Sequence, residues 1–264
     1  MIEYSLLKDE GVMPGSNHIK ICQIVLVIFF LFVFVEVGFS YDAIKNLPVP
    51  NGYERIRYDK KSYSHYLQSL PLKENRKIYK WNGKKVLGVL YNIYAVVDKP
   101  LLYKSDLEQC ADFCMRFWAD FHKNQNRLDH LFLYDYSGKK KYYKRSNKKY
   151  KSYLRWHMAY SNSFSIKNGV NQVQTKSLKP GDMFVQNKNG GIGHVSLVVD
   201  SAKNNNGKQI YLIGYGFMPA QEFHIEKAKK GYGTGGWFTK KGYEKYLSEF
   251  PFSPYGKPVI RRFE

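Results

Sequence analysis

Beyond residue 40, apolar and polar residues follow patterns that predict a few helices and many short strands. The strongest helical pattern covers residues 105–124, where apolar side chains recur at every third or fourth position and would face a core. Ser105 is placed to cap this helix, and Glu108 would complete a capping box. Weaker helical patterns cover 63–70, 152–164 and 243–250, and runs typical of strands cover 77–81, 86–90, 93–97, 131–136, 183–186, 194–199, 209–217 and 259–263.

The clearest strand pair lies on either side of a polar, glycine-rich loop at residues 187–193. Before the first strand, Pro180 and Gly181 form a turn signal, because proline fixes φ and glycine accepts conformations that other residues avoid. We expect the side chain of Asp182 to cap that turn. His194 begins the second strand directly after the loop, so we expect its imidazole to be supported by the sheet and open to a ligand.

The order of these elements predicts one α+β domain over residues 41–264, with a helix-rich first part and a sheet-rich second half. A basic insertion near 138–155 interrupts it, with nine Lys or Arg residues, no acid and several interleaved tyrosines. Such a segment is either a solvated loop or a face that contacts a polyanion.

Residues 1–40 are expected to lie outside this domain. A basic flank precedes an apolar run from Ile21 to Val35 that only Gln23 interrupts, and small residues follow. This pattern is typical of a secretory signal peptide, and with the next few residues the run approaches the length of a membrane anchor. Either way, we expect an exported domain, periplasmic or anchored in the membrane and facing away from the cytoplasm.

Composition limits the possible partners without choosing among them. The 264 residues carry a formal net charge of +20, which attracts nucleic acid, anionic lipid or an acidic envelope polymer, although biased genome composition would produce the same excess of lysine. Export and the lack of a recognised binding motif argue against nucleic acid. The three cysteines do not form a disulfide framework, and no spacing typical of a metal or cofactor site is present, so we expect neither.

Two residues, Cys110 and His194, could carry nucleophilic chemistry. Cys110 lies in the first part of the strongest helix, where backbone N–H groups and the helix dipole stabilise a thiolate. His194 could accept the thiol proton, and Gln109 could donate a hydrogen bond to an oxyanion. The alternative is that Cys110 is a small core residue, as we expect for Cys114.

Other polar residues near this helix have simpler expected roles. Asp112 and Arg116 are one turn apart in the predicted helix and are expected to pair with each other. His224 could orient a catalytic group, although histidines at strand ends are usually just exposed.

Several separated motifs resemble the bacterial family numbered 4846 among the domains of unknown function. They cover most of the chain from residue 43 onward, and the resemblance implies an exported protein of undetermined activity. The motifs are the segments 64–73, 106–116, 181–182, 193–195 and 219–225.

A second resemblance concerns mechanism. Gln109 and Cys110 at a helix start, followed later by a Gly-His strand, are similar to CHAP- and NlpC-type cysteine peptidases, which are papain-like enzymes that cut amide bonds in peptidoglycan. The resemblance implies Cys110 as nucleophile, His194 as base and Gln109 as an oxyanion donor. The orienting third residue is not at its expected place, where Tyr215 stands, and Gln221 and Asp200 are the substitutes.

The sequence therefore predicts a papain-like antiparallel sheet packed against an N-terminal helical part. The expected function is a cysteine hydrolase that cuts amide bonds in the cell envelope, with peptidoglycan or another anionic polymer as partner. The alternative is a non-catalytic domain of the same fold that binds an envelope glycan or peptide.

Overall fold

The computed structural model describes residues 41–88, 91–174 and 177–264, and the predicted signal peptide or anchor lies outside these ranges. The helices are α2 (Tyr63–Gln68), α3 (Cys110–Asn124), α4 (Tyr150–Tyr160), α5 (Ser163–Gly169) and α6 (Lys240–Leu247), with short 3-10 turns at Ile44–Asn46, Leu128–His130, Tyr143–Arg145 and Ser253–Tyr255. Within the described ranges, none of the helices combines the length and the apolar character needed to cross a bilayer.

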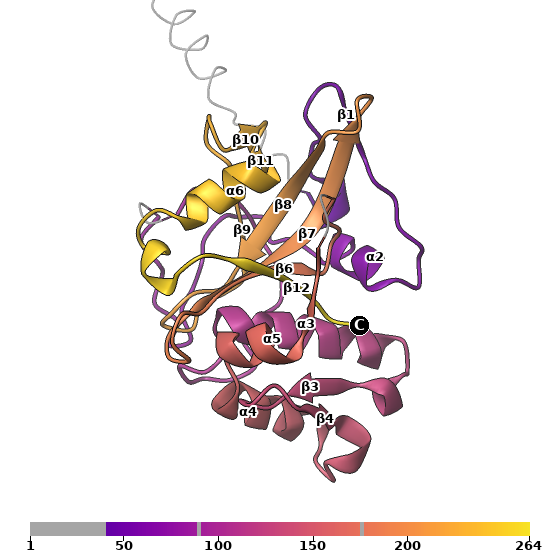
Figure 1. The fold of residues 1–264 in the computed structure, drawn as a ribbon, viewed down its shortest axis with the longest axis vertical. Coiled ribbons are helices and arrows are strands. Elements are labelled where there is room, and N and C mark those ends of the chain that lie inside the picture. The colour runs from indigo at the N-terminus through magenta and orange to yellow at the C-terminus, as the bar shows by residue number, and fades with distance from the viewer. Residues whose placement is uncertain (1–40, 89–90, 175–176) are drawn as a thin grey trace, which may run out of the picture. The chain divides into compact units, whose positions relative to one another are not determined.

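The strands form one large sheet and a separate hairpin (Figure 1). The main path of the sheet runs β10-β11-β8-β7-β6-β12-β5, with β1 beside β7 and with β9 joining β2 to β8. The strands are β1 (Tyr53–Arg55), β2 (Ile93–Val96), β3 (Phe132–Tyr134), β4 (Lys140–Tyr142), β5 (Asn171–Gln172), β6 (Asp182–Gln186), β7 (His194–Asn204), β8 (Gln209–Tyr215), β9 (His224–Glu226), β10 (Gly233–Thr234), β11 (Trp237–Phe238) and β12 (Val259–Arg262). The strand pairs of the described residues are antiparallel, so the predicted α+β class is confirmed.

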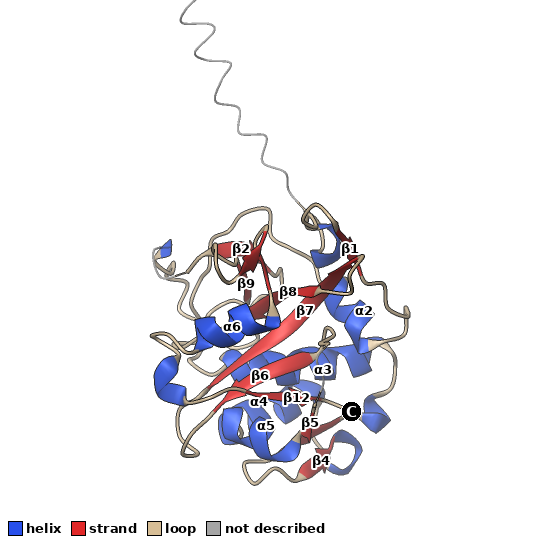
Figure 2. Cartoon of the chain, turned by 45° about the horizontal axis from the view of Figure 1, so that its top comes forward, coloured by secondary structure: helices blue, strands red, loops and turns tan. Residues whose placement is uncertain are grey.

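Helices cover both faces of the sheet (Figure 2). The two apolar cores show which side chains of strand β7 point to each face. Val195 and Leu197 belong to the larger apolar core, which contains the buried face of α3. Val198 belongs to a second core, which contains Tyr243 and Leu247 of α6. Because successive side chains of a strand point to opposite faces, the even-numbered residues at the start of β7 face α6 and the odd-numbered ones face α3.

A bulge in β7 reverses this alternation further along the strand. The register with β8 shifts between Val198 and Asp200. Val199 faces the larger core, and Ala202 faces the same core after the extra residue. Asp200 therefore points to the side of α2, where its Oδ1 accepts a hydrogen bond from Gln68 Nε2 at 2.6 Å.

The hairpin predicted around the glycine-rich loop is confirmed. Strands β6 and β7 pair with Gln186 opposite His194. The turn before β6 is held as expected, since the backbone N–H of Lys179 donates to Asp182 Oδ2 at 2.8 Å. Gly181 has φ of +104°, a conformation that favours glycine at this position.

Four sequence-based predictions of secondary structure were wrong. The helix predicted from residue 105 begins at Cys110, and the single helix predicted over 152–164 is two helices, α4 and α5. In the described part of 77–90, the two predicted strands reduce to isolated bridges, one between Tyr79 and Lys85 and one between Lys80 and Gln221. Strand β12 was predicted at an edge, but it pairs with β6 on one side and β5 on the other.

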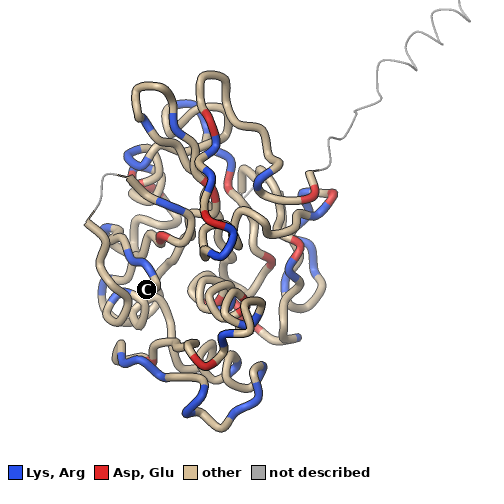
Figure 3. The backbone as a smooth tube through the Cα atoms, turned by 90° about the vertical axis from the view of Figure 1, so that its right-hand side faces the viewer, with Lys and Arg blue, Asp and Glu red and all other residues tan. Residues whose placement is uncertain are grey.

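The basic insertion is ordered around the hairpin of β3 and β4. Phe132 pairs with Tyr142 and Tyr134 with Lys140, and the chain then enters α4. Figure 3 shows lysine and arginine along the end of the molecule that carries β3, β4 and α4 in Figure 1. The segment is therefore part of the folded domain, with most of its cationic side chains exposed.

Candidate functional site

A cleft of about 610 Å³ opens at the N-terminus of α3. The first turn of α3 forms one wall, and the end of α4 with the α4–α5 loop forms the other. Residues of the glycine-rich loop and the segment after β8 close it. The lining side chains used below are Asp106, Gln109, Cys110, Asp112, Tyr136, Met158, Tyr160, Asn162, Ser163, Ile192 and Met218.

The first turn of α3 is fixed by Gln109 and Asp112. Gln109 is the N-cap residue, with extended backbone angles, and its N–H donates to Asp112 Oδ2 at 2.9 Å. Among the described residues, nothing bonds to Asp112 Oδ1. Burial raises the pKa of Asp112 well above its ordinary value, so the protonated form of this carboxyl at the cleft wall is favoured.

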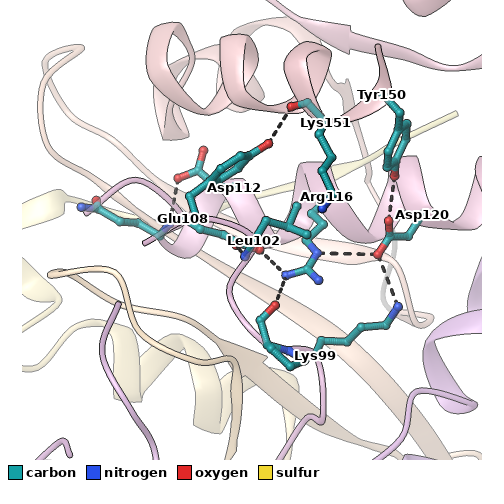
Figure 4. Close-up of polar contacts among 11 residues, drawn as sticks. Lys99, Leu102, Glu108, Asp112, Arg116, Asp120, Tyr150 and Lys151 are labelled. Atoms are coloured by element: carbon teal, nitrogen blue, oxygen red, sulfur yellow. Dashed lines mark hydrogen bonds and ion pairs between the residues drawn. The ribbon is translucent and has the colours of Figure 1, made fainter. Parts of the chain in front are cut away.

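Arg116 does not pair with Asp112 as the spacing predicted. Its guanidinium donates instead to Glu108 Oε1 and, at 2.9 Å, to the carbonyl of Pro100 (Figure 4). It also forms an ion pair with Asp120, one turn further along α3. Glu108 Oε2 in turn accepts the backbone N–H of Leu102 at 2.7 Å. This network ties the segment before α3 to the helix and so fixes the position of the cleft wall.

Cys110 is the first residue of α3 and lines the cleft with only 6% of its surface exposed. Because the helix was predicted to begin near residue 105, the structure places Cys110 closer to the helix N-terminus than expected, a position that favours a thiolate. Burial nevertheless raises the pKa of the thiol to about 11, although backbone N–H groups of Val195 and Ala111 within reach of Sγ lower it in part. Cys110 and Cys114 are both free thiols.

The structure does not bring the imidazole of His194 to this thiol. His194 pairs with Gln186, whose amide donates to carbonyls of Leu247 and Phe252 on the α6 side. The His194 ring packs at 4.9 Å from Tyr215 and 4.6 Å from Phe252, measured between centroids. A strand that presents Val195 to α3 presents His194 to α6, and among the described residues no hydrogen bond joins the imidazole to Cys110.

His194 is also fully buried, contrary to the expectation that it is open to a ligand. Its Nε2 lies 2.9 Å from Ser196 Oγ, and among the described residues Nδ1 has no hydrogen-bond partner. Burial, with a smaller contribution from nearby His224, lowers the pKa of His194 to about 3. The imidazole is therefore neutral at physiological pH.

The three candidate orienting residues are also separated from the cleft. Tyr215 touches the His194 ring, but its hydroxyl bonds to Glu226 at 3.2 Å and to Tyr246 at 2.9 Å. Gln221 Nε2 donates to the hydroxyl of Tyr91 at 2.9 Å. Asp200, turned by the bulge, pairs with Arg55 at 2.7 Å. None of these contacts orients an imidazole toward Cys110.

Gln109 lies at the cleft, but its amide is already engaged. Its Nε2 donates to Asp106 Oδ1 at 3.0 Å, and the same oxygen accepts the backbone N–H of Ala220 at 2.6 Å. The predicted oxyanion donor is thus at the right wall and directed to a structural partner. His224, another residue considered from the sequence, is fully buried near Glu226 and not exposed.

The opposite wall was not identified from the sequence. Asn162 caps α5 by accepting the N–H of Phe164 at 2.8 Å, and the Asn162 N–H donates to Ser165 Oγ at 3.0 Å. This N-cap signature could have shown that the predicted helix breaks here and exposes polar groups. A Cβ on Gly193 would lie 2.4 Å from Ser163 Oγ, so glycine lets the loop approach this wall closely.

The described residues contain no group of three or more His, Cys, Asp or Glu side chains that could hold a metal ion. The cleft therefore consists of hydroxyl, amide, carboxyl and thiol groups between tyrosine and methionine side chains. It can bind a ligand through hydrogen bonds and apolar contacts, and no histidine of the described residues lines it.

A comparison with protein families supports the first resemblance. The family described as Domain of unknown function (4846) matches residues 44–145 and 133–257. The chain belongs to this family. The two matched segments include both walls of the cleft, with Cys110 in the first and Asn162 and Gly193 in the second. No curated protein and no solved structure matches the chain at a significant level.

Proposed function

We propose that this domain is a non-catalytic binding domain that holds a peptide or glycan segment of the cell envelope in the cleft at the N-terminus of α3. One observation carries the proposal: the imidazole expected to activate Cys110 lies on the opposite side of the sheet, beside Tyr215. Without an adjacent proton acceptor, a thiol with a pKa of about 11 stays protonated at neutral pH.

The chemistry of the walls supports a ligand rich in hydrogen-bonding groups. The cleft volume of about 610 Å³ is within the range of small-ligand sites. At its rim, Tyr160 is 63% exposed and Ile192 is 72% exposed, so both offer apolar surface to a ligand. The carboxyl of Asp112 and the hydroxyl of Ser163 can exchange hydrogen bonds with amide or hydroxyl groups.

We propose that the domain shares part of the papain-like arrangement. The helix that begins at Cys110 and packs on an antiparallel sheet supports an arrangement shared with the papain-like enzymes. The orientation of His194, away from this helix, differs from the one that such an enzyme needs. The proposal also places the domain outside the cytoplasm, on the pattern of residues 1–40. A C-terminal alkaline phosphatase fusion of the full chain is expected to be active, and an inactive fusion would contradict export.

Binding is tested with soluble peptidoglycan fragments by calorimetry. Tyr160→Ala is expected to weaken binding by about tenfold, since an exposed aromatic side chain that a ligand covers commonly contributes that much. Leu87→Ala is the matched control, because Leu87 is an exposed apolar residue that does not line the cleft. Equal affinity of the two variants and the wild type, or no binding at all, would contradict the proposal.

A second candidate, the cysteine hydrolase, keeps one observation in its favour. Cys110 lies at the first residue of a helix, lines the cleft and has the Val195 N–H within reach of Sγ. Hydrolysis would require a proton acceptor to reach the thiol. Release of new fragments by the wild type, and not by Cys110→Ala, would favour this candidate.

A further inference from the structure

A second pocket, separate from the cleft, lies in the basic segment. It measures about 400 Å³ and is lined by residues of β4, of the turn that follows it and of α4. Four cationic residues line it together with aromatic side chains, and no acidic residue of the described chain does. The residues that matter here are Lys140, Lys141, Arg145, Lys148, Trp156 and His157.

Most of these cations have no acidic partner. Lys141 pairs with Asp135 at 3.2 Å. In the described residues, Lys140, Arg145 and Lys148 form no ion pair, and each is exposed. Lys140 Nζ lies 4.2 Å from the centre of the Phe132 ring, a contact that does not neutralise its charge. The pocket thus concentrates positive charge that a bound anion would neutralise.

A buried acceptor gives the pocket a second kind of contact. His157 is 1% exposed and lines the pocket. Its Nδ1 lies 3.1 Å from the carbonyl oxygen of Tyr134, so Nδ1 carries the hydrogen and Nε2 is left as the acceptor. Among the described residues Nε2 has no hydrogen-bond partner. A buried acceptor without a partner is costly unless a ligand or water donates to it.

Trp156 supplies a flat apolar surface at the same site. It precedes His157 on α4 and lines the pocket. A ring ligand could therefore stack on the indole while its polar substituents reach the cations and Nε2. A simple anion would use the cations alone. A neutral sugar would use only the indole and the imidazole.

We propose that this pocket binds an anionic sugar unit. The sugar ring lies against Trp156, a phosphate or carboxylate substituent lies among Lys140, Arg145 and Lys148, and a hydroxyl donates to His157 Nε2. The unit comes either from a soluble sugar phosphate or from an anionic polysaccharide. The site does not depend on ligand binding in the cleft, although α4 contributes residues to both.

The first experiment measures the affinity of the full chain for four small probes at pH 7: glucose 6-phosphate, glucuronate, glucose and inorganic phosphate. The two anionic sugars are expected to bind at least roughly tenfold more tightly than glucose or phosphate, because only they use all three kinds of contact. A hyaluronan hexasaccharide distinguishes the sources, since tighter binding of the hexasaccharide than of glucuronate identifies a polymer. Equal affinity for phosphate and glucose 6-phosphate would overturn the proposal.

Variants then distinguish a specific binding site from a surface that attracts any anion. His157→Phe keeps a ring and removes the acceptor, so it is expected to weaken glucose 6-phosphate binding by about tenfold and to leave phosphate binding unchanged. Trp156→Leu gives a second reading of the sugar contact if His157→Phe does not fold. Arg145→Gln should weaken both anions, while Lys144→Gln, which removes the neighbouring charge outside the pocket, should not. Equal effects of the last two variants, or tighter binding of a thymidine oligonucleotide than of the sugars, would show a non-specific basic face.

Discussion

The thiol of Cys110 is expected to react as a buried cysteine that no base assists. Burial raises its pKa from 9.0 to about 11. At pH 8 the thiolate fraction is then roughly 0.1%, against roughly 10% for a thiol at the ordinary value, because each pH unit below the pKa lowers that fraction about tenfold. Alkylation of the folded chain should therefore be slower by about 100-fold than alkylation of the unfolded chain.

Iodoacetamide labelling followed by mass spectrometry measures this rate. The background carries Cys22→Ala and Cys114→Ala, so that only Cys110 reacts, and the same chain in urea supplies the unfolded reference. Between pH 7 and pH 10 the rate should rise about tenfold per pH unit without a plateau. His194→Gln should leave the rate unchanged, because the two side chains belong to opposite faces of the sheet.

The reasoning would be refuted by a rate that levels off below pH 8 and loses that plateau in His194→Gln. Such a profile would mean that imidazole and thiol form a pair in solution. A plateau that survives in His194→Gln would instead identify another acceptor at the cleft, for which Asp112 is the carboxyl nearest in sequence.

Three further variants test the fold around the cleft through the free energy of unfolding in urea. The imidazole of His194 binds a proton near pH 6.5 in the unfolded chain and only near pH 3 in the folded chain, so stability falls as the pH falls within this window. From pH 6.5 to 5 the wild type should lose about 2 kcal/mol that His194→Gln does not lose. Parallel pH profiles of the two proteins would contradict the burial of a neutral His194. Gly193→Ala should cost about 1–3 kcal/mol, because its Cβ would lie 2.3 Å from a backbone oxygen. Gly191→Ala is the control, since the space around that residue is open. Equal stability of the two variants would contradict the close packing at Gly193. Arg262→Gln should cost about 3–5 kcal/mol, since it leaves the fully buried Asp182 carboxylate without the guanidinium that bonds both oxygens, and a loss below about 1 kcal/mol would mean that the pair is not formed.

The hairpin at the centre of the sheet could be predicted because its signals are local. Pro180 and Gly181 stop one element, the glycine-rich loop separates two strands, and Asp182 caps its turn as expected. The start of α3 could not be placed in this way. Ser105 and Glu108 match a capping box, but Glu108 bonds to Arg116, eight residues away, and that contact depends on the path of the chain before the helix.

The orientation of His194 could not be predicted for a related reason. Alternation in β7 divides its side chains into two sets, but it does not say which set faces α3. That choice depends on α6 and the segment after it, where Leu247 and Phe252 accept hydrogen bonds from Gln186. Residue types alone therefore suggested a Cys-His pair, while packing of a distant helix directs the imidazole to the other face of the sheet.

The wall formed by the α4–α5 loop illustrates the same limit. Its capping signature at Asn162 is visible in the sequence, but its position opposite Cys110 depends on long-range packing. The bulge that turns Asp200 toward α2 is likewise a property of strand pairing. Local patterns predicted the elements, and contacts between distant elements determined the site.

The central claim, that the cleft binds an envelope segment without cutting it, is tested most directly by measuring binding and products in one sample. Soluble peptidoglycan fragments are titrated in a calorimeter against the wild type, against Cys110→Ala and against buffer without protein. After the titration, the masses of the fragments in each sample are measured by mass spectrometry. Both proteins are expected to bind with similar affinity and to leave the fragment masses unchanged. New fragment masses released by the wild type and absent with Cys110→Ala, or no binding by either protein, would contradict the claim.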